Sequence, residues 1–313
     1  MDERARIARL AELLAASHPD VERGIGDDAA VLAAPGAGKL VWTIDEQVEG
    51  VHFRREWLSW EDVGWRSFVA AASDVAAMGA MPWCALSAIA LPTDVDDAAF
   101  EAIVRGQRDA AKGIDAPVVG GNLSRGPVVS ITTTVLGRAP RAVGRDGARP
   151  GQRVLLAGRV GFAAAGLRAL ERGLHDDPRL VEAVAAWRRP SPLGREGVAL
   201  GAAAHAAVDV SDGLACDLGH VADASRVAVV LEEDLLLGQP GLRVAAGALG
   251  VSEIDLVLQG GEDYALVATS DVTAPGFRTV GTVRSGKGIF LRAASGEHAV
   301  DPRGFDHFMP RGR

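Results

Sequence analysis

The chain has 313 residues, of which 48% are hydrophobic and 24% are charged, and its formal net charge is -8. An acidic chain lacks the cationic surface that general nucleic-acid binding requires, so nucleic acid is not an expected partner. The length favours two domains, and the composition is that of an ordinary globular protein.

The sequence predicts neither a disulfide framework nor a membrane anchor. Cys84 and Cys216 are far apart and form no CxxC pattern, so both are expected to be small buried residues. The N-terminal MDERARIARL carries charges where a signal peptide needs an apolar run. The uncharged stretch 75–92 is interrupted by Gly79 and Pro82, which indicates a helix end, a turn and a buried strand. The cytosol is the expected location, without membrane contact.

Apolar periodicity and turn residues predict alternating helices and strands along the N-terminal half. Ser59 and Asp62 resemble a capping box, with Asp in place of Glu, at the start of one helix. Helices are expected at 3–16, 59–78 and 97–113, and strands at 39–44, 83–91 and 128–136. A further short strand is expected to end at residues 118–119, before Gly120 and Gly121.

The stretch 137–151 is rich in Arg, Gly and Pro and lacks apolar periodicity, which places a domain boundary there. The expected domains are residues 1–140 and 141–313. In the second, strands are expected at 153–157, 207–210, 227–231, 264–269, 279–283 and 289–293. Helices are expected at 163–172, 180–187, 195–204 and 214–224. This alternation predicts an α/β fold in two domains.

Acidic residues recur at predicted element ends. The stretch GIGDDAAV, residues 24–31, places Asp27 and Asp28 after flexible glycines. The other acidic residues in such positions are Asp45, Asp74, Asp209 and Asp212. Any one of them could be a cap or a turn residue. Because magnesium prefers hard oxygen ligands and shares them with phosphate, the whole set predicts a metal–phosphate site holding more than one ion.

Other phosphate-binding motifs are missing from the sequence. It contains no GxxxxGK[ST], and no GxGxxG opens a helix after a strand. The turn from Gly158 to Gly161 follows a strand, and tight strand-to-helix packing is its favoured interpretation over a phosphate loop.

Seven motifs occur in the order and spacing of thiamine-monophosphate kinases. They are GIGDDAAV, DEQVEGVHF, ASDVAAMGA, GGNLSRG, VDVSDGLACDLGH, GGEDYAL and GFDHF. The chain resembles this family over essentially its whole length. Single motifs also occur in the wider superfamily of aminoimidazole ribonucleotide synthetase, selenophosphate synthetase and hydrogenase-maturation proteins. The combination with VEGVHF, GGEDYAL and GFDHF is more specific to the kinase.

The resemblance implies a dimer whose N-terminal mixed-sheet domains pair and bind ATP near their interface, with a C-terminal α/β domain packed beside each. It implies magnesium ligands at Asp28, Asp45, Asp74, Asp209 and Asp212. It implies ATP contacts from Thr43, Gly121, Asn122, Arg145 and Ser211, and thiamine monophosphate near His52, Glu262 and Phe305. Phe305 would offer its ring to the thiazolium cation, Glu262 would accept from the aminopyrimidine, and His52 would donate to phosphate. Relatives often carry a magnesium-binding Asp where this chain has Asn122, which weakens that predicted metal contact.

The implied reaction converts ATP and thiamine monophosphate into ADP and thiamine diphosphate. A phosphate monoester has its second pKa near ~6, so the acceptor is already ionised at neutral pH and no catalytic general base is expected. Several magnesium ions are expected instead, with ATP as co-substrate. One alternative is another superfamily activity, in which ATP activates an amide or formyl oxygen. A second is a non-catalytic nucleotide or thiamine-phosphate sensor, an alternative kept open by Asn122.

Overall fold

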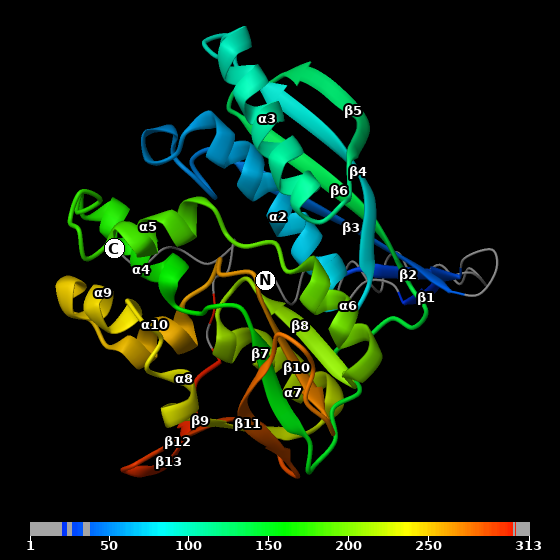
Figure 1. Cartoon of the computed structure of the whole chain (residues 1–313), viewed down its shortest axis with the longest axis vertical. Helices are drawn as coiled ribbons and strands as arrows, with labels where there is room; N and C mark the ends of the chain where they lie inside the picture. The colour runs from blue at the N-terminus through cyan, green and yellow to red at the C-terminus, as the bar shows by residue number, and fades with distance from the viewer. Residues whose placement is uncertain (1–20, 24–26, 34–37, 303, 305–313) are drawn as a thin grey trace.

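The computed structural model describes residues 21–23, 27–33, 38–302 and 304, and the strands of this part form two sheets. A six-stranded sheet holds β1 to β6, and a seven-stranded sheet holds β7 to β13. Helices pack against both sheets, as Figure 1 shows. This is the α/β class that the sequence predicts.

The first sheet has the strand order β1-β2-β3-β6-β4-β5. Its strands are β1 (Val21–Arg23), β2 (Ala30–Ala33), β3 (Lys39–Val48), β4 (Met81–Leu91), β5 (Val118–Arg125) and β6 (Ser130–Ala139). β4 and β5 run parallel and the other described pairs run antiparallel, so the sheet is mixed. The short helix η1 (Arg55–Trp57) follows β3. α2 (Trp60–Ala77) and α3 (Asp97–Gly113) pack on one face of this sheet (Figure 1).

The face of the first sheet opposite α2 carries large exposed apolar side chains. Residues alternate between the two faces of a strand, so Trp42 and Ile44 of β3 point away from the helix that covers Val41. The register aligns Ile44, Thr134 and Leu86 in one row across β3, β6 and β4. We call this surface the outer face.

Two glycines let α2 and α3 cross at close range. A Cβ added to Gly64 would lie 1.9 Å from the backbone oxygen of Ile103, and one added to Gly106 would lie 2.0 Å from a backbone oxygen of α2. Only glycine fits such a crossing. α2 begins at the predicted capping box, in which Ser59 and Asp62 each accept the backbone N–H of the other.

The second sheet has the order β13-β12-β9-β11-β7-β10-β8. Its strands are β7 (Arg153–Ala157), β8 (Ala206–Val210), β9 (Ala228–Glu232), β10 (Ala265–Ser270), β11 (Arg278–Arg284), β12 (Gly288–Ala293) and β13 (Gly296–Val300). β9 and β12 run parallel, whereas the other described pairs are antiparallel. The helices are α4 (Phe162–Glu171), α5 (Val181–Arg188), α6 (Gly194–Ala203), α7 (Leu214–Ser225), α8 (Glu233–Leu236), α9 (Leu242–Leu249) and α10 (Glu253–Gln259).

Helix α2 joins the two halves of the molecule. It packs on β3 and β6 of the first sheet and also contacts β8, β10 and α6. One cluster of buried apolar residues accordingly includes Val63 and Ile103 together with Val154 and Trp187. Within the described part of the chain, no helix combines the length and the apolar character needed to cross a bilayer.

Two of the predicted strand ends that differ from the structure bear on the site. The strand expected to end at residues 118–119 begins there and runs to Arg125, because Gly120 and Gly121 continue it beside the backbone of Ser87. β3 continues beyond residue 44 because its polar end pairs with the Thr-rich β6, so Asp45 lies inside a strand. The elements β1, β2, β13, η1, α8, α9 and α10 were not predicted from the sequence. The helix predicted at 3–16 lies outside the described residues.

Candidate active site

Three carboxylates from distant parts of the chain meet where α2 joins the two sheets. Asp28 precedes β2, Asp74 lies near the end of α2, and Asp209 lies in β8. One oxygen of each lies within 4.8 Å of the others, and we call this group the carboxylate triad. Burial raises the pKa of Asp28 to about 7 and that of Asp209 to about 6, and burial with neighbouring carboxylates raises the pKa of Asp74 well above its usual value. A divalent cation would favour the ionised form of all three.

Hydroxyl groups and one guanidinium surround the triad. Thr43 Oγ1 donates to Asp74 Oδ2 at 2.6 Å, and Ser73 Oγ donates to the carboxylate in β8 at 2.8 Å. Arg145, on the connection between the sheets, forms an ion pair with Asp28 Oδ1. The other oxygen of Asp28 is buried and has no hydrogen-bond partner among the described residues. Clustered hard oxygens, one of them without a donor, fit the ligand set that magnesium takes.

A cleft of about 660 Å³ opens next to this triad, within the size range of small-molecule sites. Five of the predicted site residues line it: Asp45, His52, Ser211, Asp212 and Glu262. Trp57, Arg54 and Arg168 also line it, and the sequence did not single them out. The cleft thus combines carboxylates, cations and an aromatic ring around one space.

Asp45 connects the cleft with the triad. Burial raises its pKa to about 6, and the guanidinium of Arg66 partly opposes this shift. Its charge in turn raises the pKa of Asp74 and of Asp209. Asp212 raises the pKa of Asp209 as well, so the cleft and the triad form one electrostatic unit.

His52 is oriented by the backbone that precedes it. The backbone N–H of Val48 donates to the ring Nδ1 of His52 at 3.0 Å, and the backbone N–H of His52 donates to the carbonyl of Val48 at 2.9 Å. Because Nδ1 accepts, a neutral ring carries its proton on Nε2. His52 is therefore prepared to act as a donor from Nε2.

Glu262 is held by two donors that the sequence analysis did not identify. Arg66 Nη2 donates to Oε1 at 2.6 Å, and Trp187 Nε1 donates to Oε2 at 2.7 Å. The Arg66 guanidinium also lies 4.5 Å from the centroid of the Trp187 ring. Arg66 is an isolated charge in the apolar stretch of α2. This isolated charge was the one feature of the sequence that could have indicated a role for Arg66 in the site.

The turn that carries Ser211 and Asp212 is held by a second unpredicted residue, Asp217. Its Oδ2 accepts the backbone N–H groups of Ser211, Asp212 and Gly213, each at 3.1 Å. Burial raises the pKa of Asp217 well above its usual value, and the charge of Asp212 adds to the effect. The signal for this role was an acidic residue in the first turn of a helix that follows an Asp-Gly turn.

Gly121 and Asn122 lie apart from the cleft. Both line a separate hollow of about 730 Å³ beside α3 and β5. The sheet register places Asp45, Thr133, Ser87 and Gly121 in one row across four strands. Three strand spacings of about 4.8 Å separate the ends of this row by ~14 Å, too far for one magnesium ion to bind both Asp45 and Asn122 of the same chain.

Phe305 lies outside the described residues. Its neighbour Gly304 lines the cleft, near the turn of Asp212.

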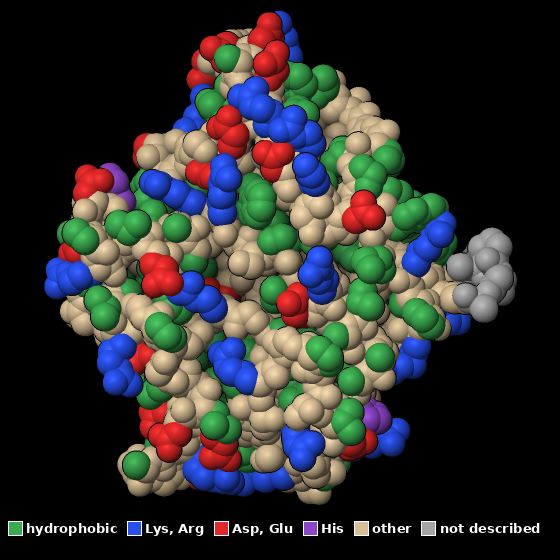
Figure 2. Space-filling view, in the orientation of Figure 1, with side chains coloured by type: hydrophobic (Ala, Val, Ile, Leu, Met, Phe, Trp, Pro, Cys, Tyr) green, Lys and Arg blue, Asp and Glu red, His purple; other side chains and the backbone are tan. Residues whose placement is uncertain are grey.

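On the face of the molecule shown in Figure 2, basic and acidic side chains are interspersed.

Comparison with known proteins identifies related chains along almost the whole sequence. Residues 26–139 match the family model "AIR synthase related protein, N-terminal domain". The chain is 37% identical over 291 residues to the thiamine-monophosphate kinase of Mycobacterium tuberculosis, covering 91% of this chain and 85% of the relative. It is 34% identical over 295 residues to that of Aquifex aeolicus, covering 91% and 92%.

The solved structures agree with these relatives. The structure of AaThiL complexed with AMPPCP and TMP matches with a TM-score of 0.89 and 32% identity, covering 98% of this chain and 97% of that one. The resemblance seen in the sequence motifs and the predicted fold class are thereby confirmed. The chain belongs to the thiamine-monophosphate kinase family of phosphotransferases.

Proposed function

We propose that this chain transfers the γ-phosphoryl group of ATP to thiamine monophosphate, giving ADP and thiamine diphosphate. The main support for this proposal is that the carboxylate triad and the cleft form one electrostatic unit. The chain that carries them matches the structure of AaThiL complexed with AMPPCP and TMP. A triad beside a small-molecule cleft suits the transfer of a charged group between two anions.

The proposed transfer is a direct in-line displacement. An oxygen of the acceptor phosphate bonds to the γ-phosphorus, the bond from that phosphorus to the β–γ bridging oxygen breaks, and ADP leaves with the electron pair. The acceptor is already deprotonated at neutral pH, so no side chain is needed as a general base. Bound magnesium ions would neutralise the negative charges of the two phosphates, which otherwise repel each other.

The chain's own residues have distinct proposed roles. Magnesium ligands are proposed at Asp28, Asp45, Asp74, Asn122, Asp209 and Asp212. Contacts to ATP are proposed for Thr43, Gly121, Asn122, Arg145 and Ser211, and contacts to thiamine monophosphate for His52, Glu262 and Phe305. We propose an ATP-binding, metal-binding and dimerisation domain of residues 1–140 and a second domain of residues 141–313, which adds Arg145, Asp209, Ser211 and Asp212 to the same site.

The protein is proposed to act as a homodimer that pairs through the outer face of the first sheet. Ile44 of β3 is 68% exposed, Leu86 of β4 in the same row is 45% exposed, and Trp83 of β4 is 44% exposed, which is unusual for large apolar side chains on one sheet. Because Asn122 lies ~14 Å from Asp45 along the register of one sheet, we propose that its contact is made to the partner's site.

The proposed function is tested by incubating the protein with ATP, magnesium and a panel of thiamine, thiamine monophosphate and aminoimidazole precursors, with products identified by mass. The expected products are thiamine diphosphate and ADP from the monophosphate alone. Efficient phosphorylation of free thiamine would contradict the proposed acceptor. Binding without turnover would identify a sensor instead of a kinase.

A further inference from the structure

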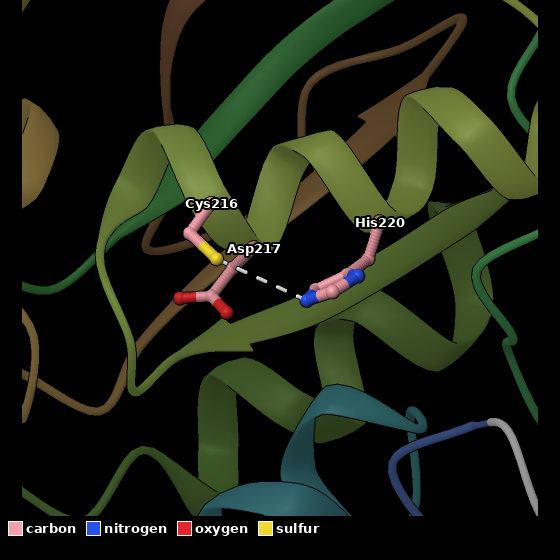
Figure 3. Close-up of side chains that lie close together, drawn as sticks. All are labelled: Cys216, Asp217 and His220. Atoms are coloured by element: carbon pink, nitrogen blue, oxygen red, sulfur yellow. Dashed lines mark hydrogen bonds between the residues drawn. The ribbon is translucent and has the colours of Figure 1, made fainter. Parts of the chain in front are cut away.

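A second group of metal-ligating side chains lies on α7. Cys216, Asp217 and His220 offer a sulfur, a carboxylate oxygen and a ring nitrogen that all lie within 4.8 Å of one another. Cys216 Sγ and His220 Nε2 are 4.0 Å apart. Figure 3 shows the three side chains close together beside the helix. We call this group the α7 cluster.

The donor types of the α7 cluster differ from those of the carboxylate triad. Thiolate and imidazole ligands favour zinc and similar ions over magnesium, which takes oxygen. In a tetrahedral zinc site with bonds of about 2.3 Å to sulfur and 2.0 Å to nitrogen, these two atoms lie ~3.5 Å apart. The observed 4.0 Å separation of Cys216 and His220 is within half an ångström of that value. Their i, i+4 spacing places them on the same face of the helix.

The α7 cluster has one buried member, Asp217, which is 3% exposed, and two members nearer the surface. Cys216 and His220 are both partly exposed, whereas the sequence predicted a buried cysteine. The backbone of Gly304 passes close to Cys216, and a Cβ added there would lie 2.5 Å from Sγ. A larger residue at position 304 would therefore clash with the thiol.

Asp217 links the α7 cluster to the candidate active site. The same carboxylate accepts the backbone N–H groups of Ser211, Asp212 and Gly213. We propose that Cys216, Asp217 and His220 form a site for a zinc-class cation, and that its occupation slows turnover by drawing the Asp217 carboxylate away from this turn. The effect on turnover rests on the proposed kinase function, whereas binding of the cation does not.

Binding is tested with cobalt, which replaces zinc and gives a thiolate-to-metal absorption band when cysteine is a ligand. The full chain is titrated with Co²⁺ and then with competing Zn²⁺, at saturating magnesium. Cys216→Ser should abolish the band, and His220→Gln should weaken Co²⁺ binding by at least about tenfold, since even outer partners of a ligand contribute that much. Cys84→Ser and His298→Gln are the matched controls and should leave the titration unchanged. Absence of a band, or its loss in Cys84→Ser, would overturn the site.

The effect on turnover is measured with Zn²⁺ at saturating magnesium, ATP and thiamine monophosphate. Wild type and Cys84→Ser should be inhibited at the same Zn²⁺ concentrations that displace Co²⁺, whereas Cys216→Ser should retain its activity to at least about tenfold higher Zn²⁺. Equal inhibition of Cys216→Ser and wild type would show that Zn²⁺ acts without Cys216 and would overturn the proposed coupling. A chain that binds Co²⁺ through Cys216 but turns over no substrate would instead contradict the proposed function alone.

Discussion

The guanidinium of Arg66 donates to the carboxylate of Glu262 at 2.6 Å, although the two residues are 196 positions apart in the sequence. Arg66 is only 1% exposed, whereas Glu262 is 25% exposed and lines the cleft. The buried cation therefore fixes the position of a carboxylate that faces the proposed substrate. Arg66 is a positioning residue, because its described contacts are with the protein.

Replacing Arg66 should mainly affect substrate affinity. In Arg66→Met we expect KM for thiamine monophosphate to rise by about tenfold or more with a smaller change in kcat, since Glu262 loses one of its two donors. The free energy of unfolding should fall by about 1–3 kcal/mol, because a partly buried ion pair is broken. Steady-state kinetics and urea unfolding measure the two effects.

Arg66→Lys keeps the charge and should recover much of the affinity. Arg108→Met, at an exposed position of α3, is the control and should change neither quantity. An unchanged KM in a folded Arg66→Met protein would show that Glu262 does not depend on Arg66 for its position.

Asp45→Asn and Asp209→Asn should each nearly abolish turnover while the chain stays folded. Each removes a negative charge from the electrostatic unit that is proposed to hold magnesium, and a loss of this kind raises the barrier by roughly 3 kcal/mol or more. Activity assays with a magnesium titration measure the effect, with the exposed Asp176→Asn as control. Wild-type activity of either variant at limiting magnesium would contradict the metal assignment.

The metal-free protein should lose stability as the pH rises from about 4 to about 7. The pKa values of Asp28, Asp45 and Asp209 are raised from 3.8 to about 7, 6 and 6, chiefly by burial. Between the unfolded and folded pKa values the native state binds more protons than the unfolded state, so the free energy of unfolding falls with increasing pH. Each unit of difference between the folded and unfolded pKa of a group changes the free energy of unfolding by up to about 1.4 kcal/mol.

Urea unfolding at several pH values in EDTA measures this dependence. Magnesium binds the ionised carboxylates, so millimolar magnesium should restore stability at pH 7 and have little effect at pH 4. Asp209→Asn should show a shallower dependence. Stability that rises with pH over this range in EDTA would contradict the assigned burial of these carboxylates.

Charges on the outer face should dissociate the proposed dimer. Ile44→Glu or Trp83→Glu would place a carboxylate in the middle of the interface, where it loses water without gaining a partner. Light scattering at micromolar concentration should give a dimer for the wild type and a monomer for either variant. Val272→Glu, at a 55% exposed position outside this sheet, should remain dimeric. A monomeric wild type would reject the assembly itself.

Asn122→Asp should lower the magnesium concentration for half-maximal activity by a factor of a few. Asparagine keeps an oxygen ligand but lacks the charge that attracts the cation. The maximal rate is not expected to rise, since the added charge also repels the transferring phosphoryl group. A magnesium titration at saturating ATP compares the two forms, and superimposed curves would make Asn122 a turn residue without metal contact.

Mixed dimers test which chain supplies Asn122. A heterodimer of Asp45→Asn with Asn122→Ala contains one site with both native residues only if Asp45 and Asn122 come from different chains. Activity above that of either parent homodimer is therefore expected. A heterodimer no more active than its parents would place both residues in one site of the same chain.

The sequence by itself determined the family and most of the longer elements, and it predicted the chemistry of the site. The capping box at Ser59, the strand 153–157 and the start of α7 at residue 214 all agree with the structure, because caps and apolar periodicity act over a few residues. Aspartates at the ends of several predicted elements indicated cations and phosphate, because few other ligand classes need so many hard oxygens.

The tertiary structure alone decided which of these residues meet. Asp28, Asp74 and Asp209 converge because α2 packs on both sheets, and the register separates Asn122 from Asp45 by three strand spacings. The Arg66–Glu262 pair has no local signature, because its two residues belong to segments brought together only by packing. Such contacts depend on strand order and register, which are set by the burial of whole faces and not by short motifs.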